Sequence, residues 1–346
     1  MDRLRILVTF PLEAELVREI EAVDPRVEVR VLAETERRAL RGLYPSEAEA
    51  AAVRAGIEGA FRDADVIFGF WGAQLHEAFT GAGEIRDVAP NLKWIQLTSA
   101  GADRLLQSGF VGRGVIVTTA SGLHATPIGE YVLAVMLMFA KGAPRFFRAQ
   151  LRREWARFLP SELHGKTVGI VGMGNIGREV ARLSKAFGCR VLGIRRSVSA
   201  RTSDEHADEV LPPSELASLL RESDYVVLAT PLTPETRAMI AEPQLRAMKP
   251  TAVLVNIARG PIVVEGDLVR ALREGWIAGA ALDVFEREPL PADSPLWDLE
   301  NVILTPHISG GTEIYNRRAV GIFTDNIRRF LAGEPLRNVV DPERGY

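Results

Sequence analysis

Short apolar runs alternate with segments of helical periodicity along almost the whole chain. The apolar runs have the length and the β-branched and aromatic content of strands, and they span residues 5–9, 27–32, 66–70, 94–98, 115–118, 167–171, 190–194, 225–229, 252–256, 277–283 and 302–305. Helical patterns lie between them, and the clearest span residues 46–62, 127–141, 175–187 and 317–331. Strands that alternate with helices predict parallel sheets covered by helices on both faces.

A single sheet would need about a dozen strands, more than the usual range of roughly 2–10. The chain has 346 residues, and at roughly 100–200 residues per domain this length favours two domains. The expected fold class is therefore α/β, with two doubly wound parallel-sheet domains and an active-site cleft between them. The helix at residues 317–331 follows the last strand, so we expect it to return to the N-terminal part. The expected division is residues 1–104 plus 308–346 against residues 105–307.

Composition and charge narrow the class of protein. Hydrophobic residues make up 47% and charged residues 25% of the chain, as in ordinary globular proteins. The formal net charge of −3 argues against non-specific binding to nucleic acid or to an anionic membrane. The apolar run at residues 131–140 is about half as long as a membrane span, and the first apolar run is too short for a signal peptide. The one cysteine, Cys189, fits a reducing compartment, so we expect a cytoplasmic protein.

A glycine-rich turn, Gly172-Met173-Gly174-Asn175-Ile176-Gly177, follows the strand at residues 167–171 and opens a helical pattern. In this context Gly172 permits a tight turn, Gly174 lets the backbone approach a pyrophosphate, and Gly177 allows close helix–strand packing. The start of the helix supplies amide donors and the positive end of a dipole for phosphates. The alternative is a purely structural turn. The strand before it and the helix after it favour a dinucleotide site.

The end of the next strand bears on which dinucleotide binds. An NAD enzyme usually carries Asp or Glu about 20 residues after the first glycine, to bind the ribose 2′-hydroxyl. Here Arg195-Arg196-Ser197 occupies that place, and no acid follows until Asp204. Guanidinium groups bind phosphate in a bidentate manner, which favours NADP(H), with NAD(H) as a possible second cofactor. The alternative is that both arginines point to solvent and cofactor specificity is loose.

Three polar side chains follow late strands, where open α/β sheets bind their ligands. They are Arg259, the carboxylate Glu288 and His307. Reduction of a 2-keto acid needs a cation for the carboxylate and carbonyl, a general acid for the developing alkoxide, and an aligned hydride donor. Arg259 suits the first role and His307 the second, while a neighbouring carboxylate would hold the tautomer of His307 and favour its charged form. No metal site is predicted. The other histidines are interpreted as surface residues, with His124 near the crossing between domains.

These segments resemble the D-isomer-specific 2-hydroxyacid dehydrogenase family, in the order and spacing of its Arg, Glu and His signatures. The resemblance implies two Rossmann-like domains: a discontinuous, flavodoxin-like substrate-binding domain and a dinucleotide-binding Rossmann domain. It implies that Arg259 binds substrate, that Glu288 pairs with His307, and that His307 is the acid/base. The remaining residues implied are Ala100 and Gly101 for the substrate carboxylate, and Thr230, Pro231, Ile257, Ala258 and Asp283 for the cofactor. Arg259 and His307 are expected at both ligands.

Some features depart from the commonest family pattern. Val263-Val264 stands where Val-Asp is frequent, which predicts a local effect only. The arginines at the ribose position place the chain with NADPH-preferring glyoxylate and hydroxypyruvate reductases. Glu288, instead of Gln, disfavours a formate dehydrogenase, and the chain leaves no room for a C-terminal serine-binding regulatory domain. The alternative function is a dinucleotide-sensing, corepressor-like binding protein on the same fold.

Two further expectations concern surfaces. The helix at residues 127–141 is apolar on nearly every face, and such a helix must be buried. It therefore predicts a homodimer through this helix, with a small 2-keto or 2-hydroxy acid as the other partner. The arginine-rich stretch at residues 145–157 is interpreted as the solvated face of a helix. Candidate walls of the substrate pocket, for which plain packing is an equal alternative, are Phe70, Trp71, Gly72 and Trp155.

Overall fold

The computed structural model describes residues 3–40, 43, 47–69, 84–102, 105, 111 and 114–341. The chain divides into two compact units, one made of Met1–Leu123 with Thr312–Tyr346 and one of His124–Gly311. The predicted boundary after residue 104 is therefore too early, because β5 (Ile116–Thr118) pairs with β4 and completes the first sheet. The second boundary follows Gly311 instead of residue 307. Phe70, Trp71, Gly72 and His76 lie outside the described residues.

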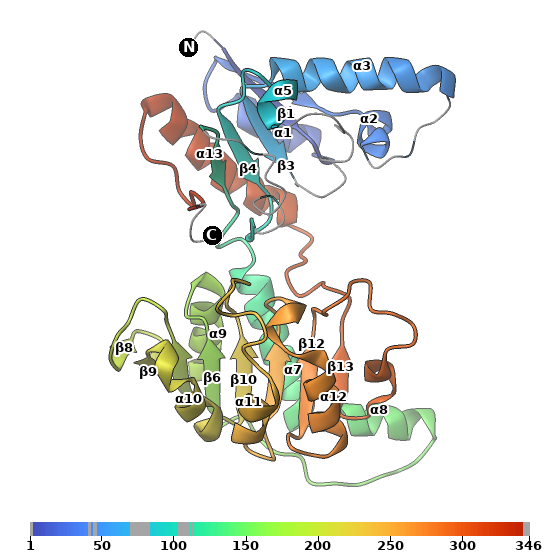
Figure 1. Ribbon diagram of the computed structural model, residues 1–346, viewed down its shortest axis with the longest axis vertical. Helices are drawn as coiled ribbons and strands as arrows, with labels where there is room; N and C mark the ends of the chain where they lie inside the picture. The colour runs from blue at the N-terminus through green and yellow to red at the C-terminus, as the bar shows by residue number, and fades with distance from the viewer. Residues whose placement is uncertain are drawn as a thin grey trace. The chain divides into compact units, whose positions relative to one another are not determined.

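The first unit contains a parallel five-stranded sheet (Figure 1). Its strands stand in the order β2 (Val27–Val31), β1 (Leu4–Val8), β3 (Val66–Gly69), β4 (Trp94–Leu97) and β5 (Ile116–Thr118). The order 2-1-3-4-5 is that of flavodoxin-like folds. One face packs against α2 (Glu34–Ala39), α3 (Glu47–Asp63) and α5 (Ile85–Val88). The other face packs against α1 (Ala14–Glu21) and α13 (Tyr315–Ala332).

The last helix, α13, belongs to the core of this first unit. Phe323 stacks on Phe68 with ring centroids 4.1 Å apart and contacts Trp94 as well. A buried polar network joins the same elements: Asn326 donates to Gln96, which also accepts from Thr118 at 2.8 Å. Gln96 and Asn326 are both fully buried, so each needs these partners. The C-terminal part of the chain thereby completes a unit that begins at the N-terminus.

The second unit contains an eight-stranded sheet. Its order is β13 (Val302–Leu304), β12 (Gly279–Leu282), β11 (Val253–Asn256), β10 (Tyr225–Leu228), β6 (Thr167–Val171), β7 (Arg190–Ile194), β9 (Ala207–Leu211) and β8 (Thr202–Asp204). All pairs are parallel except β8 with β9. If β6 is taken as the first strand, the order contains the Rossmann sequence 3-2-1-4-5-6, whose switch point lies between β6 and β10. The pattern along the chain did not predict β8 and β9, because their short segments are half polar.

Helices cover both faces of this second sheet. α7 (Ala125–Ala140) and α9 (Asn175–Ala186) pack on one face, and α10 (Leu216–Glu222), α11 (Glu242–Ala247) and α12 (Glu265–Arg273) pack on the other. α7 begins at Ala125 with His124 as its N-cap residue, two positions before the predicted start. α8 (Ala143–Leu151) ends before the predicted arginine-rich helix does. None of the described helices is long and apolar enough to cross a membrane.

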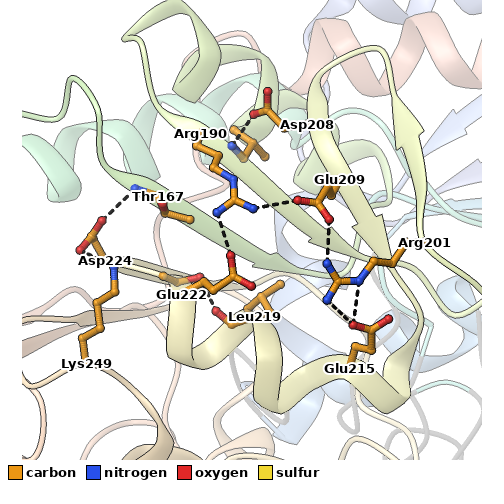
Figure 2. Close-up of polar contacts among 12 residues, drawn as sticks. Thr167, Arg190, Arg201, Asp208, Glu209, Glu215, Leu219, Glu222, Asp224 and Lys249 are labelled. Carbon is orange, nitrogen blue, oxygen red and sulfur yellow. Dashed lines mark hydrogen bonds and ion pairs between the residues drawn. The ribbon is translucent and has the colours of Figure 1, made fainter.

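A network of ion pairs joins the start of β7, the middle of β9 and the segments before β8 and after β9 (Figure 2). Arg190, at the start of β7, pairs with Glu209 and Glu222, and Arg201 pairs with Glu209 and Glu215. Such exposed pairs contribute little individually but support each other in a network. The ligand-binding side chains predicted for this unit follow the carboxyl ends of its strands.

In each of the two sheets an aspartate at the amino end of a strand accepts hydrogen bonds from a backbone amide and a lysine. Asp224 accepts the amide of Thr167 at 2.9 Å and the ammonium group of Lys249 at 2.9 Å (Figure 2). In the first unit Asp65 accepts the amide of Arg5 at 3.1 Å and the ammonium group of Lys93 at 2.7 Å. Each aspartate directly precedes a central strand, so it satisfies an amide on the neighbouring strand. This edge serves stability in both units.

Candidate active site

The glycine turn after β6 has the geometry that a dinucleotide needs. Gly172 has φ +110°, and a side chain there would meet the carbonyl oxygen of Ala229 at 2.5 Å. A side chain at Gly177 would meet the carbonyl oxygen of Gly172 at 2.0 Å. Only glycine fits either position, because the turn crosses so close to β10 and to the helix. The turn is also anchored to β7, since Gly172 and Met173 both donate to the carbonyl of Ile194.

The space in front of this turn is open. A side chain built at Gly174 would have no atom within 4 Å. Gly174 is the N-cap residue of the 12-residue helix α9, and no side chain caps it. The first amides of α9 therefore lack the intrahelical partners that later amides have. An open backbone surface at a helix N-terminus is the chemistry that binds a pyrophosphate, so these residues fit the predicted group.

The arginines after β7 lie in different environments. Arg195 is partly buried and donates to Asp204 at 2.5 Å. Asp204 also pairs with Arg178 at 3.2 Å and is only 9% exposed in its side chain. Its nearness to two guanidinium groups lowers the pKa of Asp204, against the effect of burial. The next residue, Arg196, is exposed. A hydrogen bond from Thr233 lowers the pKa of Glu235, and the positive charge of Arg196 lowers it further.

The loop after β11 holds Arg259 through a buried asparagine. Asn256 is 1% exposed; its side-chain oxygen accepts the amide of Ala258 at 3.1 Å, and its nitrogen donates to the carbonyl of Arg259 at 3.2 Å. The guanidinium of Arg259 donates to the carbonyl of Ala258 at 2.8 Å. Gly260 lies so close to the backbone of Phe285 that any side chain would clash, at 1.9 Å. Asn256 was not identified from the sequence as a residue that holds the Arg259 loop. The signal that could have found it is an asparagine at the end of an apolar strand.

The structure brings Glu288 and His307 together. The Nδ1 atom of His307 lies 2.8 Å from one carboxylate oxygen of Glu288. The other carboxylate oxygen accepts the amide of Phe285 at 3.2 Å. The side chain of His307 is 45% exposed, so the ring is accessible to a ligand. A half-exposed imidazole oriented by a carboxylate can take up and release a proton.

Asp283 supports the loop that carries His307. It is fully buried and follows β12. One oxygen accepts the Thr305 hydroxyl at 2.6 Å and the Ile308 amide at 2.9 Å, and the other accepts the Ser309 amide at 2.9 Å. This carboxylate was predicted at the cofactor. Its side-chain oxygens instead accept hydrogen bonds from residues that flank His307.

His124 lies beside Arg259 and is mostly buried. Burial, together with the positive charge of Arg259, lowers the pKa of His124 from 6.5 to about 4. Its ring also contacts the Gly310 position, where a side chain would meet it at 2.8 Å. The interpretation of His124 as a surface residue is therefore wrong. Nothing in the local sequence signalled this, because Arg259 and Gly310 are far away along the chain.

The other residues predicted at the site lie in several different segments of the chain. Ala100 and Gly101 belong to the first unit, in a loop where the Ser99 hydroxyl donates to the carbonyl of Gly101 at 2.8 Å. The Tyr315 hydroxyl donates to the carbonyl of Thr98, just before that loop, at 2.7 Å. Thr230 and Pro231 follow β10, and the carbonyl of Pro231 accepts the Thr236 hydroxyl. Ile257 and Ala258 are buried, whereas Trp155 is 88% exposed.

Comparison with known proteins identifies the family. Residues 133–309 match the model of the NAD-binding domain of D-isomer specific 2-hydroxyacid dehydrogenases. The chain belongs to this family. Glyoxylate reductase of Korarchaeum cryptofilum is 39% identical over 269 residues, which cover 75% of this chain and 79% of that protein. D-3-phosphoglycerate dehydrogenase of Methanocaldococcus jannaschii is 33% identical over 340 residues, which cover 98% of this chain and 59% of that protein.

Solved structures of family members agree over the whole chain. A family member from Xanthobacter autotrophicus, in complex with NADPH and MES, has a TM-score of 0.80 and 30% identity, with all of both chains covered. An NADPH-dependent glyoxylate/hydroxypyruvate reductase from Sinorhizobium meliloti, in complex with NADP and sulfate, has a TM-score of 0.78 and 28% identity. That match covers 99% of this chain and 100% of the other. The protein is thus a dehydrogenase of the D-2-hydroxyacid type, and the predicted family and fold are confirmed.

Proposed function

We propose that this dehydrogenase reduces a small 2-keto acid, with glyoxylate or hydroxypyruvate as the best candidates, and that it prefers NADP(H). The observation that carries the proposal is the Glu288–His307 pair, 2.8 Å apart, on loops that follow the late strands of the nucleotide-binding sheet. Relatives described as glyoxylate reductases, 39% and 38% identical to this chain, support the choice of substrate. The family member with NADPH and the one with NADP support the choice of cofactor.

Each polar residue has a distinct task in this reaction. Arg259 binds the substrate carboxylate and polarises the carbonyl, because a planar guanidinium can donate hydrogen bonds to the carboxylate oxygens and to the carbonyl oxygen. His307 donates the proton that the developing alkoxide requires. Glu288 orients the ring: a carboxylate can only accept, so the hydrogen on Nδ1 points to it and Nε2 faces the substrate. The amides of Ala100 and Gly101 are further ligands for the carboxylate.

The cofactor fits the residues after β6, β7 and β10. Bound NADPH supplies the hydride. The open backbone at Gly174 and the N-terminus of α9 hold the pyrophosphate, and Thr230, Pro231, Ile257 and Ala258 line the remainder of the site. Arg196 and Ser197 bind the 2′-phosphate from the exposed end of β7. Arg195, held by Asp204, adds positive charge next to them in the chain.

Cofactor oxidation on addition of substrate tests the proposal directly. Absorbance at the nicotinamide band is followed after glyoxylate, hydroxypyruvate, pyruvate or phenylpyruvate is added to the protein with NADPH or NADH. The proposal expects rapid oxidation with glyoxylate or hydroxypyruvate and a clear advantage for NADPH. Tight NADPH binding without oxidation by any of the four acids would instead favour the dinucleotide-sensing alternative.

A further inference from the structure

Three hydrogen bonds to one buried carboxylate enclose His307. Before the histidine, the Thr305 hydroxyl donates to Asp283 at 2.6 Å. After it, the amides of Ile308 and Ser309 donate to the two oxygens of Asp283, each at 2.9 Å. Asp283 is 0% exposed, so its oxygens need these hydrogen-bond donors. The position of the His307 backbone is therefore set on both sides by a single side chain.

The backbone at His307 needs such support. Its φ is +56°, in the left-handed region that a non-glycine residue seldom adopts. The amide of His307 donates to the carbonyl of Thr305 at 3.0 Å, which closes a tight turn over Pro306. A residue in this region costs energy that surrounding contacts must offset. Weaker contacts to Asp283 would let the turn relax and move the imidazole away from Glu288.

The hydroxyl that completes this arrangement is itself held by a tyrosine on α7. Tyr131 Oη lies 2.8 Å from Thr305 Oγ1. The single hydrogen of Thr305 is committed to the carboxylate, which can only accept, so the phenol is the donor in the Tyr131–Thr305 bond. Burial raises the pKa of Tyr131 to about 12, and the nearby Asp283 acts in the same direction. The phenol therefore keeps its hydrogen throughout the neutral range.

We propose that Thr305 and Tyr131 are positioning residues for the acid/base His307, acting as a directed chain from Tyr131 through Thr305 to Asp283. This inference rests on the proposed role of His307. The phenol orients the Thr305 hydroxyl, that hydroxyl and two amides fix Asp283, and Asp283 holds the His307 turn. Neither residue touches the reacting atoms in this scheme. Their effect is on the placement of the ring, and hence on turnover rather than on ligand binding.

The first test removes the Thr305 hydroxyl. Thr305→Val should lower kcat by about ten- to a hundredfold, the usual cost of misplacing a reacting group. KM for glyoxylate and the dissociation constant for NADPH, measured by fluorescence, should stay within about threefold. Thr305→Ser keeps the hydroxyl and should recover most of kcat. Thr324→Val removes a buried threonine hydroxyl from α13 in the other unit and is the matched control, with unchanged kcat.

The second test asks whether the two hydroxyls act as one chain. Tyr131→Phe alone should lower kcat by roughly two- to tenfold, the worth of one neutral hydrogen bond. In a Thr305→Val background the same change should cost nothing more, because the acceptor is already gone. Hydrogen exchange supplies a readout besides activity: the Ile308 and Ser309 amides should exchange faster in Thr305→Val. Tyr225→Phe, which alters a buried tyrosine on β10, is the control for the phenol.

Several results would overturn the positioning role. One is a Thr305→Val protein whose kcat stays within about twofold of the parent. Another is an equal loss of kcat in Thr305→Val and Thr305→Ser. The third is a double variant, Thr305→Val with Tyr131→Phe, in which the two losses of kcat multiply fully. His307→Ala separates this failure from that of the proposed function. If His307→Ala is inactive while Thr305→Val is normal, only the positioning role is wrong. If His307→Ala is itself active, the proposed acid/base is wrong as well.

Discussion

The Nδ1 nitrogen of His307 lies 2.8 Å from the carboxylate of Glu288, and the second oxygen of that carboxylate accepts the amide of Phe285. The carboxylate is thus held at one oxygen by backbone while it orients the imidazole with the other. The two residues are on successive loops of the same unit, after β12 and β13. This arrangement gives the proposed acid/base a defined direction before substrate binds.

Loss of the imidazole should abolish most of the turnover. His307→Ala is expected to lower kcat for glyoxylate by about 10²–10⁴, the usual range for a general acid, while NADPH affinity stays nearly unchanged. Glu288→Gln should cost about tenfold, because a charge-assisted hydrogen bond becomes a neutral one. Arg259→Ala should impair KM and kcat together. Steady-state rates and fluorescence titration with NADPH check these outcomes; activity of His307→Ala within about threefold of the parent would contradict the assignment.

Cofactor preference should depend on the exposed end of β7. NADPH is expected to be preferred by at least about tenfold, since each charge-assisted contact to a phosphate contributes roughly 1.5–3 kcal/mol. Changing Arg195 and Arg196 together to Ala should raise KM for NADPH far more than KM for NADH. Arg196→Ala alone should produce part of this effect, because Arg196 is exposed just after the end of β7. Arg190→Ala, at the amino end of β7, is the matched control; equal use of both cofactors by the parent would refute the preference.

The protein should be a homodimer through α7. Leu133, Leu137 and other apolar residues of this helix are only partly buried within the chain, and the segment after it exposes Leu151, Trp155 and Leu159 at 86%, 88% and 97%. Light scattering at micromolar concentration should give twice the 38.0 kDa chain mass. Trp155→Asp with Leu159→Asp should weaken the dimer. Leu43→Asp, at an exposed leucine of the other unit, should leave it intact, and a monomeric parent would exclude this interface.

Stability should fall in mild acid because of His124. Its pKa is about 4 in the folded protein and 6.5 ordinarily, so below pH 6.5 the unfolded chain binds a proton that the folded chain does not. The stabilising difference is complete above pH 6.5 and is lost as the pH falls toward 4. It amounts to at most about 3.4 kcal/mol, at roughly 1.4 kcal/mol per pH unit, and partial exposure reduces it.

Urea unfolding at pH 4.5 and pH 7.5 measures this effect. The parent should lose more stability between the two pH values than His124→Gln, whose side chain does not titrate. Carboxylates elsewhere titrate equally in both proteins, so the difference between them isolates His124. Parallel losses in the two proteins would show that His124 titrates normally.

Local pattern was sufficient for the strands other than β8 and β9 and for the residues that follow them. The alternation of apolar runs and helical periods placed β6 and β7 at the observed residues, because the period of side-chain burial is a property of the local backbone. The carboxyl ends of parallel strands meet at one edge, so the order of Arg259, Glu288 and His307 along the chain already predicted a common site. The glycine turn was predictable for the same reason, since its steric demands act within a few residues and the adjacent strand.

Only the tertiary structure decided which side chains support that site. Tyr131 and Thr305 are 174 residues apart, Asp204 meets Arg195 through the unpredicted pairing of β8 with β9, and His124 is partly buried beside Arg259. Periodicity shows that a residue is buried but not which partner it meets, because that depends on the order of strands and on helix packing. The sequence therefore determined the family, the strands other than β8 and β9, and which polar residues follow them. The fold determined how each reactive group is held.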